Sequence, residues 1–402
     1  GNQLYLSRAF SIDVFGAPLG SIKSIFRFQF ANSADEFRKA LHEFDLSCNF
    51  VFADVDGNIA YQQTGLIPKL QPGTSGLYPL RGWEPNNTWT ERWYSSDLKS
   101  IVNPSEGYIV TANDEHNPAN EAITAVNAHM GSYRAQRIRS LLAANDAITS
   151  DDFKAMQRDL YSTQAQSYMD LLKPVLSKLP QKASEEAIRA LQSWDCKYNK
   201  ESRGAAVFED FYHELLTLIF KPFYDQANKH WESILRRTPV ITFFNYFDKL
   251  IFDYSSELDT VLWKGESREN LFLRALKVTL EKYATAGSVK PYGDNRQIYM
   301  SHILMKDVLP DRLGALLGLH YGPFAFEGSR ATPAQGQIFM VGKGIKQTFG
   351  ASWRFITEVK KNVEEYESVL PGGPSENRWF RYNLYKMDVE KWVNFLYKKI
   401  KI

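Results

Sequence analysis

The middle of this chain carries apolar residues three and four positions apart, whereas both ends carry short alternating segments. One apolar stripe contains Leu271, Phe272, Leu276, Leu280 and Tyr283. Such a stripe covers one face of an amphipathic helix and belongs to a core far more often than to a cofactor site. The pattern predicts an α+β protein with one sheet-containing domain. Residues 1–147 form its first part, a helical insertion follows at 148–318, and the closing strands and the last helix lie in 319–402.

The segment NFVFADVDGNIAYQQTG predicts a β-hairpin near the start of the chain. Two β-rich arms flank Asp56-Gly57, a dipeptide that suits the positive-φ positions of a tight turn. Before the hairpin, Ser33-Ala-Asp-Glu36 has the pattern of a capping box. It predicts a helix that begins after Ser33 and continues through Phe44.

Period-two segments predict the strands of the domain. They lie near Asn49–Thr64, Tyr108–Asn113, Gln337–Val341 and Thr348–Val359. We expect these strands to form stacked sheets in which the early and late thirds of the chain pair. The last helix is expected to bury Val389, Trp392, Phe395 and Leu396.

Charge and hydropathy exclude two kinds of partner. The formal net charge is only +2 over 402 residues, and no dense run of Lys and Arg is present. Binding of nucleic acid phosphates needs a concentrated basic face, so nucleic acid is not expected as the main partner. No apolar run reaches the roughly 18 residues that a membrane span needs.

The two cysteines, Cys48 and Cys196, have a spacing that matches no metal motif. Two alternatives stay open for them at this point. They form a disulfide, or they are two buried free thiols, which are common in protein cores.

Several well-known site motifs are missing from the sequence. There is no HExxH metalloprotease helix and no GxSxG nucleophile turn. The segment VGKGIKQTFG lacks the spacing of a phosphate-binding loop. None of the seven histidines has ligand spacing with another, and each is interpreted as an ordinary surface or core residue. The residues alone therefore predict a mixed domain of helices and strands without a defined activity.

Four sequence blocks, in the same order, resemble one enzyme family. The blocks are NFVFADVDGNIAYQQTGLIP, GLYPLRGW, NPSEGYIVTAND and the closing pair GASWRFITEV and LPGGPSENRW. They are similar to the later part of the catalytic (beta) subunit of penicillin acylases and acyl-homoserine-lactone acylases, which are N-terminal-nucleophile hydrolases. The resemblance covers about residues 1–145 and 320–402.

This resemblance implies a four-layer αββα sandwich and an amide hydrolase, or acylase, that cleaves an acyl group from an amide. In the family, a Ser at a newly exposed N-terminus attacks the carbonyl and its own α-amine is the general base. An α-amine has a pKa of about 8, so it accepts the hydroxyl proton near neutral pH. The alternative is a non-catalytic, penicillin-acylase-like binding protein.

Two residues match catalytic positions of the family. Asn113 aligns with the Asn whose side chain donates to the oxyanion of the tetrahedral intermediate; the alternative is an Asn that bonds its own turn. Arg134 aligns with an Arg beside the N-terminal amine, where a cation favours the neutral amine. The alternative for Arg134 is a surface Arg on a helix, and Arg137 and Arg139 lie close to it in sequence.

The resemblance also implies a substrate-binding segment. Asn49, Phe50, Val51 and Phe52 lie where family members line the acyl pocket. Because side chains alternate along a strand, only one face of this segment can line the pocket, and the other face belongs to the core.

The remaining expectations concern partners and cofactors. Gly1 has no side chain, so the nucleophile is expected upstream or on another processed chain of the same precursor. A large apolar surface or an accompanying chain is expected where that part packs. The family's calcium carboxylate would fall at Ile123 or Thr124, with Glu121 as the nearest acid, so no metal site and no cofactor are expected in this segment. The family implies a small-molecule amide substrate and export to the periplasm or outside the cell.

Overall fold

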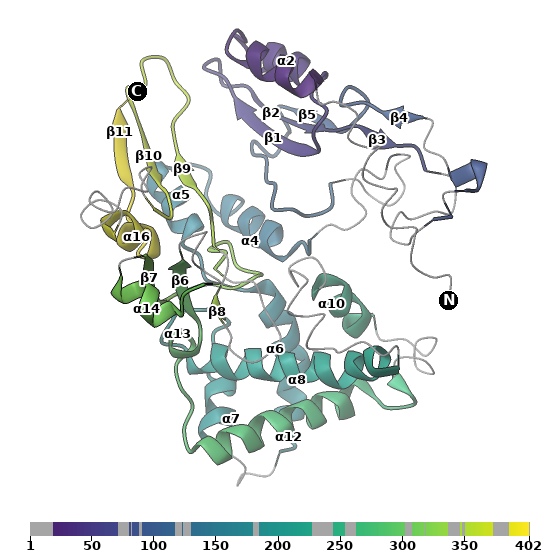
Figure 1. Cartoon of the computed structure of the whole chain (residues 1–402), viewed down its shortest axis with the longest axis vertical. Helices are drawn as coiled ribbons and strands as arrows, with labels where there is room; N and C mark the ends of the chain where they lie inside the picture. The colour runs from purple at the N-terminus through teal and green to yellow at the C-terminus, as the bar shows by residue number, and fades with distance from the viewer. Residues whose placement is uncertain are drawn as a thin grey trace. The chain divides into compact units, whose positions relative to one another are not determined.

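The structure, a computed structural model, divides into two compact units (Figure 1). It describes residues 19–70, 80–81, 83–87, 91–116, 123, 130–179, 185–226, 244–253, 263–301, 308–317, 319–336, 346–347, 350–372 and 386–401. The first unit is Gly1–Met130 with Glu358–Glu364, and the second is Gly131–Thr357 with Glu365–Ile402. The two units are described separately below.

The first unit contains the predicted hairpin. Its elements are α2 (Leu19–Phe28), α3 (Ala34–Leu41), β1 (Cys48–Ala53), β2 (Ile59–Thr64), β3 (Ile67–Pro68), η1 (Pro85–Asn87), β4 (Arg92–Trp93) and β5 (Ser100–Val102). Strand β2 lies between β1 and β5 in an antiparallel sheet, and β3 pairs with β4. The turn between β1 and β2 includes Gly57 at a φ of 88°, so the turn prediction is confirmed.

The hairpin turn also fixes the start of α3. The carboxylate of Asp54 accepts hydrogen bonds from the backbone of Ala34, at 3.0 Å, and from Asn58. These hydrogen bonds lower the pKa of Asp54 to about 2, and the bond from Ala34 has the largest effect. Ser33 caps the helix by accepting from the backbone of Glu36, as predicted, but the Glu36 carboxylate accepts from Asn32 instead of returning to Ser33. The predicted extension to Phe44 is wrong, because α3 ends at Leu41.

The prediction of a strand at Tyr108–Asn113 is also wrong. The segment is irregular, and the strand that joins the hairpin is β5, at Ser100–Val102. A strand persists only where a neighbour accepts its hydrogen bonds. Within the described residues no strand pairs with 108–113, and the backbone turns at Asn113, where φ is 64°.

The second unit is mostly helical, as predicted. Its helices are α4 (Tyr133–Leu142), α5 (Ser150–Gln157), α6 (Thr163–Leu176), α7 (Glu185–Gln192), α8 (Arg203–Gln226), α10 (Phe244–Phe252), α12 (Arg268–Ala286), α13 (Tyr292–Asn295), α14 (Asp311–Leu316) and α16 (Lys386–Val393). Helices α8 and α12 pack along each other, in teal and green in Figure 1. All five residues of the predicted stripe on α12 are buried in the large core of this unit. No described helix combines the length and apolar character that a membrane crossing requires.

Two small sheets complete the second unit. Their strands are β6 (Gln297–Ser301), β7 (His320–Ala325) and β8 (Lys346–Gln347) in one sheet, and β9 (Arg354–Ile356), β10 (Glu365–Val369) and β11 (Lys398–Lys401) in the other. The region 148–318, predicted as a helical insertion, also contains strand β6, which pairs with β7 and β8. The predicted strand Gln337–Val341 lies outside the described residues. Within Thr348–Val359 the described strand is β9.

Two further expectations are corrected among the described residues. Strands of the first unit pair only with one another there, so the expected pairing between early and late thirds is absent from the described part. Of the four residues that the last helix was expected to bury, Val389, Trp392 and Phe395 are buried, but Leu396 is 55% exposed. Helix α16 ends at Val393, and Phe395 has a φ of 55°, which turns the next residue out of the core.

Candidate active site

Asn113 lies at a turn that its neighbours fix. The Oδ1 atom of Asp114 accepts from the backbone of Ala112 at 3.0 Å, and the carbonyl of Asn113 accepts from the backbone of Met130 at 2.8 Å. The side chain of Asn113 is exposed, whereas Asp114 is buried. Asn is one of the few residues that adopt a positive φ readily. These two hydrogen bonds hold the backbone of the turn, and the Asn113 side chain extends from it toward solvent.

A chain of side-chain contacts, with Tyr61 and Asp114 buried in it, connects this turn to the hairpin. The Nε2 atom of His116 lies 3.5 Å from Oδ1 of Asp114, and its ring lies 5.1 Å from the ring of Tyr61. The hydroxyl of Tyr61 donates to Oδ1 of Asn49 at 2.8 Å. Burial, and then the charge of Asp114, raise the pKa of Tyr61, so the hydroxyl keeps its proton and acts as a donor. The network thus links Asn49 to the turn of Asn113.

Phe50 and Phe52 lie on the opposite face of β1. Phe50 is edge-on to Phe44 with ring centroids 5.2 Å apart, and Phe52 lies 4.8 Å from Phe37. Phe28 of α2 completes this aromatic cluster. The predicted pocket residues therefore do not share a face: Asn49 is on the Tyr61 side, and the two phenylalanines pack beneath the helices.

Arg134 lies in the first turn of α4 in the second unit. It is half-buried, and its Nη1 atom donates to Oε1 of Gln335 at 3.4 Å. Arg137, one turn later, is bound differently: Nε and Nη2 donate to both carboxylate oxygens of Asp159 at 2.9 and 2.8 Å. The guanidinium of Arg137 also lies 4.7 Å from the ring of Tyr161. Arg137 therefore forms a structural ion pair with Asp159.

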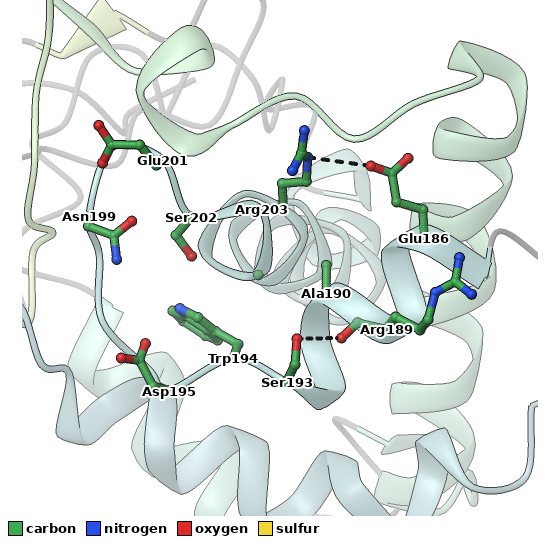
Figure 2. Close-up of a pocket in the computed structure, with 11 residues that line it drawn as sticks. Glu186, Arg189, Ala190, Ser193, Trp194, Asp195, Asn199, Glu201, Ser202 and Arg203 are labelled. Atoms are coloured by element: carbon green, nitrogen blue, oxygen red, sulfur yellow. Dashed lines mark hydrogen bonds and ion pairs between the residues drawn. The ribbon is translucent and has the colours of Figure 1, made fainter.

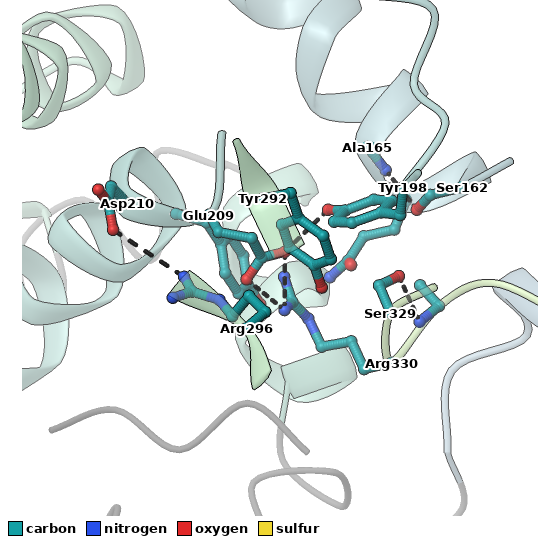
Figure 3. Close-up of polar contacts among 12 residues, drawn as sticks. Ser162, Ala165, Tyr198, Glu209, Asp210, Tyr292, Arg296, Ser329 and Arg330 are labelled. Carbon is teal, nitrogen blue, oxygen red and sulfur yellow. Dashed lines mark hydrogen bonds and ion pairs between the residues drawn. The ribbon is translucent and has the colours of Figure 1, made fainter. Parts of the chain in front are cut away.

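The second unit contains a fully buried ion pair (Figure 3). Nη1 of Arg330 donates to Oε1 and Oε2 of Glu209 at 3.0 and 2.8 Å, and the hydroxyl of Tyr198 donates to the same carboxylate at 2.8 Å. The guanidinium lies 4.4 Å from the ring of Tyr212. Burial acts to lower the pKa of Arg330, but the charge of Glu209, the nearby hydroxyls of Tyr212 and Tyr198 and the hydrogen bond to Glu209 together raise it. The pair has no solvent access, which favours a structural function.

A second buried network surrounds Asp248 of α10. Its carboxylate accepts from the hydroxyls of Tyr133, Tyr168 and Tyr212 at 3.0, 2.6 and 2.8 Å, and from the amide of Gln164 at 2.6 Å. Burial raises the pKa of Asp248, and these donors oppose the shift. Tyr212 belongs to both networks, through its ring to Arg330 and its hydroxyl to Asp248.

A surface pocket of about 400 Å³ lies between α7 and the start of α8 (Figure 2). Its charged lining residues are Glu186, Arg189, Asp195, Glu201 and Arg203. Both signs of charge are present, and Glu186 already pairs with Arg203 at 3.4 Å. None of the residues predicted for the site lines this pocket.

Metal and thiol chemistry receive no support from the described residues. Within them, no three His, Cys, Asp or Glu side chains lie close enough to hold a metal ion. Glu121 and Thr124, which are relevant to the calcium expectation, lie outside the described residues. Both cysteines are free thiols, so the disulfide alternative is wrong. The alternative of two buried thiols holds for Cys196, which is buried, but not for Cys48, which is exposed. Burial raises the pKa of Cys196 to about 12, which leaves its thiol protonated.

Comparison with known proteins defines the class and then the family. This chain is similar to the solved structure of a thermostable penicillin G acylase from Alcaligenes faecalis, with a TM-score of 0.66 and 14% sequence identity. The match covers 96% of this chain and 70% of the acylase chain. At that identity the likeness shows the fold alone, and it confirms the predicted α+β fold of N-terminal-nucleophile hydrolases. The penicillin amidase family model matches residues 7–402, and the chain belongs to this family.

Two curated relatives share a shorter segment with the chain. Penicillin acylase 2 proenzyme from Pseudomonas sp. (strain SE83) is 28% identical over 179 residues, which are 42% of this chain and 22% of that protein. Acyl-homoserine lactone acylase QuiP from Pseudomonas syringae pv. tomato is 30% identical over 190 residues, which are 44% of this chain and 22% of that protein. The chain thus matches about a fifth of the length of these relatives.

Proposed function

We propose that this chain is the later part of the catalytic subunit of an amide hydrolase that removes an acyl group from an amide. The family match over residues 7–402 is the observation that carries the proposal. The nucleophile is an N-terminal Ser outside these 402 residues. Its hydroxyl oxygen bonds to the carbonyl carbon as its α-amine takes the proton. The C–N bond then breaks, that proton leaves with the amine, and water hydrolyses the acyl ester.

Asn113 is the proposed oxyanion donor from this chain. A donor of this kind is effective when it is held in place before the negative charge develops. The bonds of Ala112 and Met130 to the turn and the exposure of the Asn113 side chain support this role. The face of β1 with Asn49 is the proposed acyl-pocket face, since Phe50 and Phe52 are engaged in the aromatic cluster.

The substrate class follows from the names of the relatives. They include a penicillin acylase and acyl-homoserine lactone acylases, so we propose linear amides or acylated lactones as substrates. The proposed partners are the other processed chains of the same precursor, and the proposed compartment is the periplasm or the exterior. Ile22, Ile25 and Phe26 share one face of α2 and are 51%, 55% and 65% exposed, which supports a covering chain there.

The test is an assay of the complete, processed protein with phenylacetyl and octanoyl p-nitroanilides, penicillin G and an N-octanoyl homoserine lactone. We expect hydrolysis of at least one of these amides, together with mass-spectrometric detection of an acyl group on a new N-terminal Ser. Saturable binding of these compounds without hydrolysis, and without a processed Ser, would support the binding-protein alternative instead.

Arg134→Ala is expected to move the acidic limb of the pH–kcat/KM profile to higher pH. Loss of a nearby cation raises the pKa of the N-terminal amine, so more of the amine is protonated at a given pH and less acts as base. The limb should move by about one pH unit, the lower end of the effect of a neighbouring charge. Arg134→Lys retains the charge and should move it less, and Arg139→Ala on the same helix is the control. An unmoved limb in Arg134→Ala would remove Arg134 from the mechanism.

A further inference from the structure

The face of the hairpin that bears Asn49 is open on one strand and buried on the other. Asn49, Val51 and Ala53 alternate with the two phenylalanines along β1, so they share this face, and all three are exposed. Opposite them on β2, Gln63 pairs with Asn49 and is 4% exposed. Tyr61 pairs with Val51 and is fully buried. A ligand on this face therefore contacts β1, and it meets an amide beside two apolar side chains.

The side-chain amide of Asn49 is held in one orientation by Tyr61. The hydroxyl of Tyr61 donates to Oδ1 of Asn49 at 2.8 Å. A hydroxyl has a single proton to donate, and the raised pKa of Tyr61 keeps that proton on the oxygen. Because the Tyr61 side chain is buried, it cannot turn away from Asn49 without repacking its surroundings. The oxygen of the amide is therefore engaged, and its NH2 group remains for another partner.

This NH2 group is a donor without an acceptor inside the described part of the chain. No described residue accepts a hydrogen bond from Nδ2 of Asn49, and the residue is exposed, so water is its present partner. A ligand that covers Asn49 displaces this water. A donor that loses its partner costs free energy, whereas a ligand oxygen at that point replaces the lost hydrogen bond.

The surroundings of the amide define the rest of such a ligand. Val51, which is 50% exposed, and Ala53 offer hydrocarbon surface to a hydrocarbon chain. The face thus suits an apolar chain that carries one oxygen acceptor. It also lies in the same unit as the Asn113 turn, to which Tyr61 connects it.

We propose that Asn49 is a specificity residue that selects acyl groups with a keto oxygen on the hydrocarbon chain, and that Tyr61 is its positioning residue. This inference rests on the proposed function, which places the acyl group on this face, and it names the acyl class. The contribution of Asn49 to the preference for such chains is expected to be about three- to tenfold in kcat/KM, the usual net effect of one hydrogen bond.

The test uses the complete processed enzyme and the leaving group that it accepts best, with octanoyl, 3-oxooctanoyl and 5-oxooctanoyl as acyl groups. The measured quantity is the ratio of kcat/KM for the better oxo substrate to kcat/KM for the octanoyl substrate. Asn49→Leu keeps the size of the side chain but has no donor, so this ratio should fall by about three- to tenfold. Comparison of the two enzymes cancels the intrinsic reactivity of each substrate. Asn49→Asp should lower the ratio further, because a carboxylate repels the keto oxygen.

Tyr61→Phe tests the positioning role. Without the hydroxyl the amide is free to rotate, so the ratio should fall part of the way toward that of Asn49→Leu. In an Asn49→Leu background the same change should leave the ratio as it is, since Tyr61 acts through Asn49. A role in stability alone would lower kcat/KM for all three substrates equally. Asn145→Leu is the matched control, the same change at an exposed position of the second unit, and should keep the wild-type ratio.

The outcomes separate the inference from the proposed function. If the substrates are hydrolysed and Asn49→Leu keeps the wild-type ratio, the selection by Asn49 is overturned while the proposed function stands. An unchanged ratio in Tyr61→Phe overturns the positioning role. An enzyme that hydrolyses phenylacetyl amides but refuses all three octanoyl-type chains also overturns the inference. If no amide is hydrolysed at all, both proposals fall. Thermal unfolding of each variant checks that the fold is retained.

Discussion

Asn113→Ala in the complete enzyme is expected to lower kcat by about 10²–10³-fold, the usual loss for one oxyanion-hole donor. KM should change far less, because the donor acts on charge that exists only in the transition state. The measurement is the steady-state kinetics of the best p-nitroanilide substrate.

Backbone strain has to be separated from the loss of the amide in this experiment. Asn113 has a positive φ, which alanine tolerates poorly, so Asn113→Gly is the informative partner variant. It relieves the strain and still lacks the donor, and its kcat should fall as far as that of Asn113→Ala. Asn103→Ala provides the control, since Asn103 also has a positive φ, of 46°, and is not part of the proposed site. Turnover close to wild type in Asn113→Gly would show that another residue stabilises the oxyanion.

Arg330→Met is expected to lower the free energy of unfolding by about 3–5 kcal/mol, because it leaves the buried carboxylate of Glu209 without its cation. Denaturant unfolding of the complete protein, followed by circular dichroism, measures the change. The surface pair Arg189–Glu185, with side chains 71% and 63% exposed, is the comparison. Arg189→Met should cost less than about 1 kcal/mol.

The double variant Arg330→Met/Glu209→Gln tests the cause of that loss. If the cost comes from an uncompensated charge, removing the second charge should recover part of the stability. A double variant less stable than Arg330→Met alone would mean that the carboxylate mainly serves Tyr198, which donates to it at 2.8 Å.

Local residue patterns predicted the elements that are determined by residues close together in sequence. The stripe on α12 depends on residues a few positions apart, and the hairpin turn at Asp56-Gly57 depends on two residues, so both were predictable. Strand β6 was missed because its partners, β7 and β8, lie further along the chain and give no local signal. The segment Tyr108–Asn113 was predicted as a strand from its β-forming residues. A strand forms only where a neighbouring strand pairs with it, and no described strand pairs with this segment.

For the site, similarity to the family suggested Asn113, Arg134 and Asn49, and their catalytic and binding roles remain predictions. It did not suggest the residues that hold them. His116 had no ligand spacing with any other histidine and was interpreted as ordinary, yet its ring lies between Tyr61 and Asp114 beside the Asn113 turn. The sequence around Gln335 carries no motif, and its contact with Arg134 depends on the folded loop. Such contacts between distant positions are not visible in residue patterns.

The shared position of Tyr212 has a consequence for how this protein can change over evolutionary time. The hydroxyl of Tyr212 donates to Asp248 and its ring lies against Arg330, so a substitution at Tyr212 disturbs two buried polar networks at once. Loss of Glu209, Arg330 or Asp248 alone is expected to destabilise the fold, because it leaves buried hydrogen-bonding partners unsatisfied. These positions should therefore be exchanged together or not at all among homologues, and the covariation of Glu209 with Arg330 across the family would record that history.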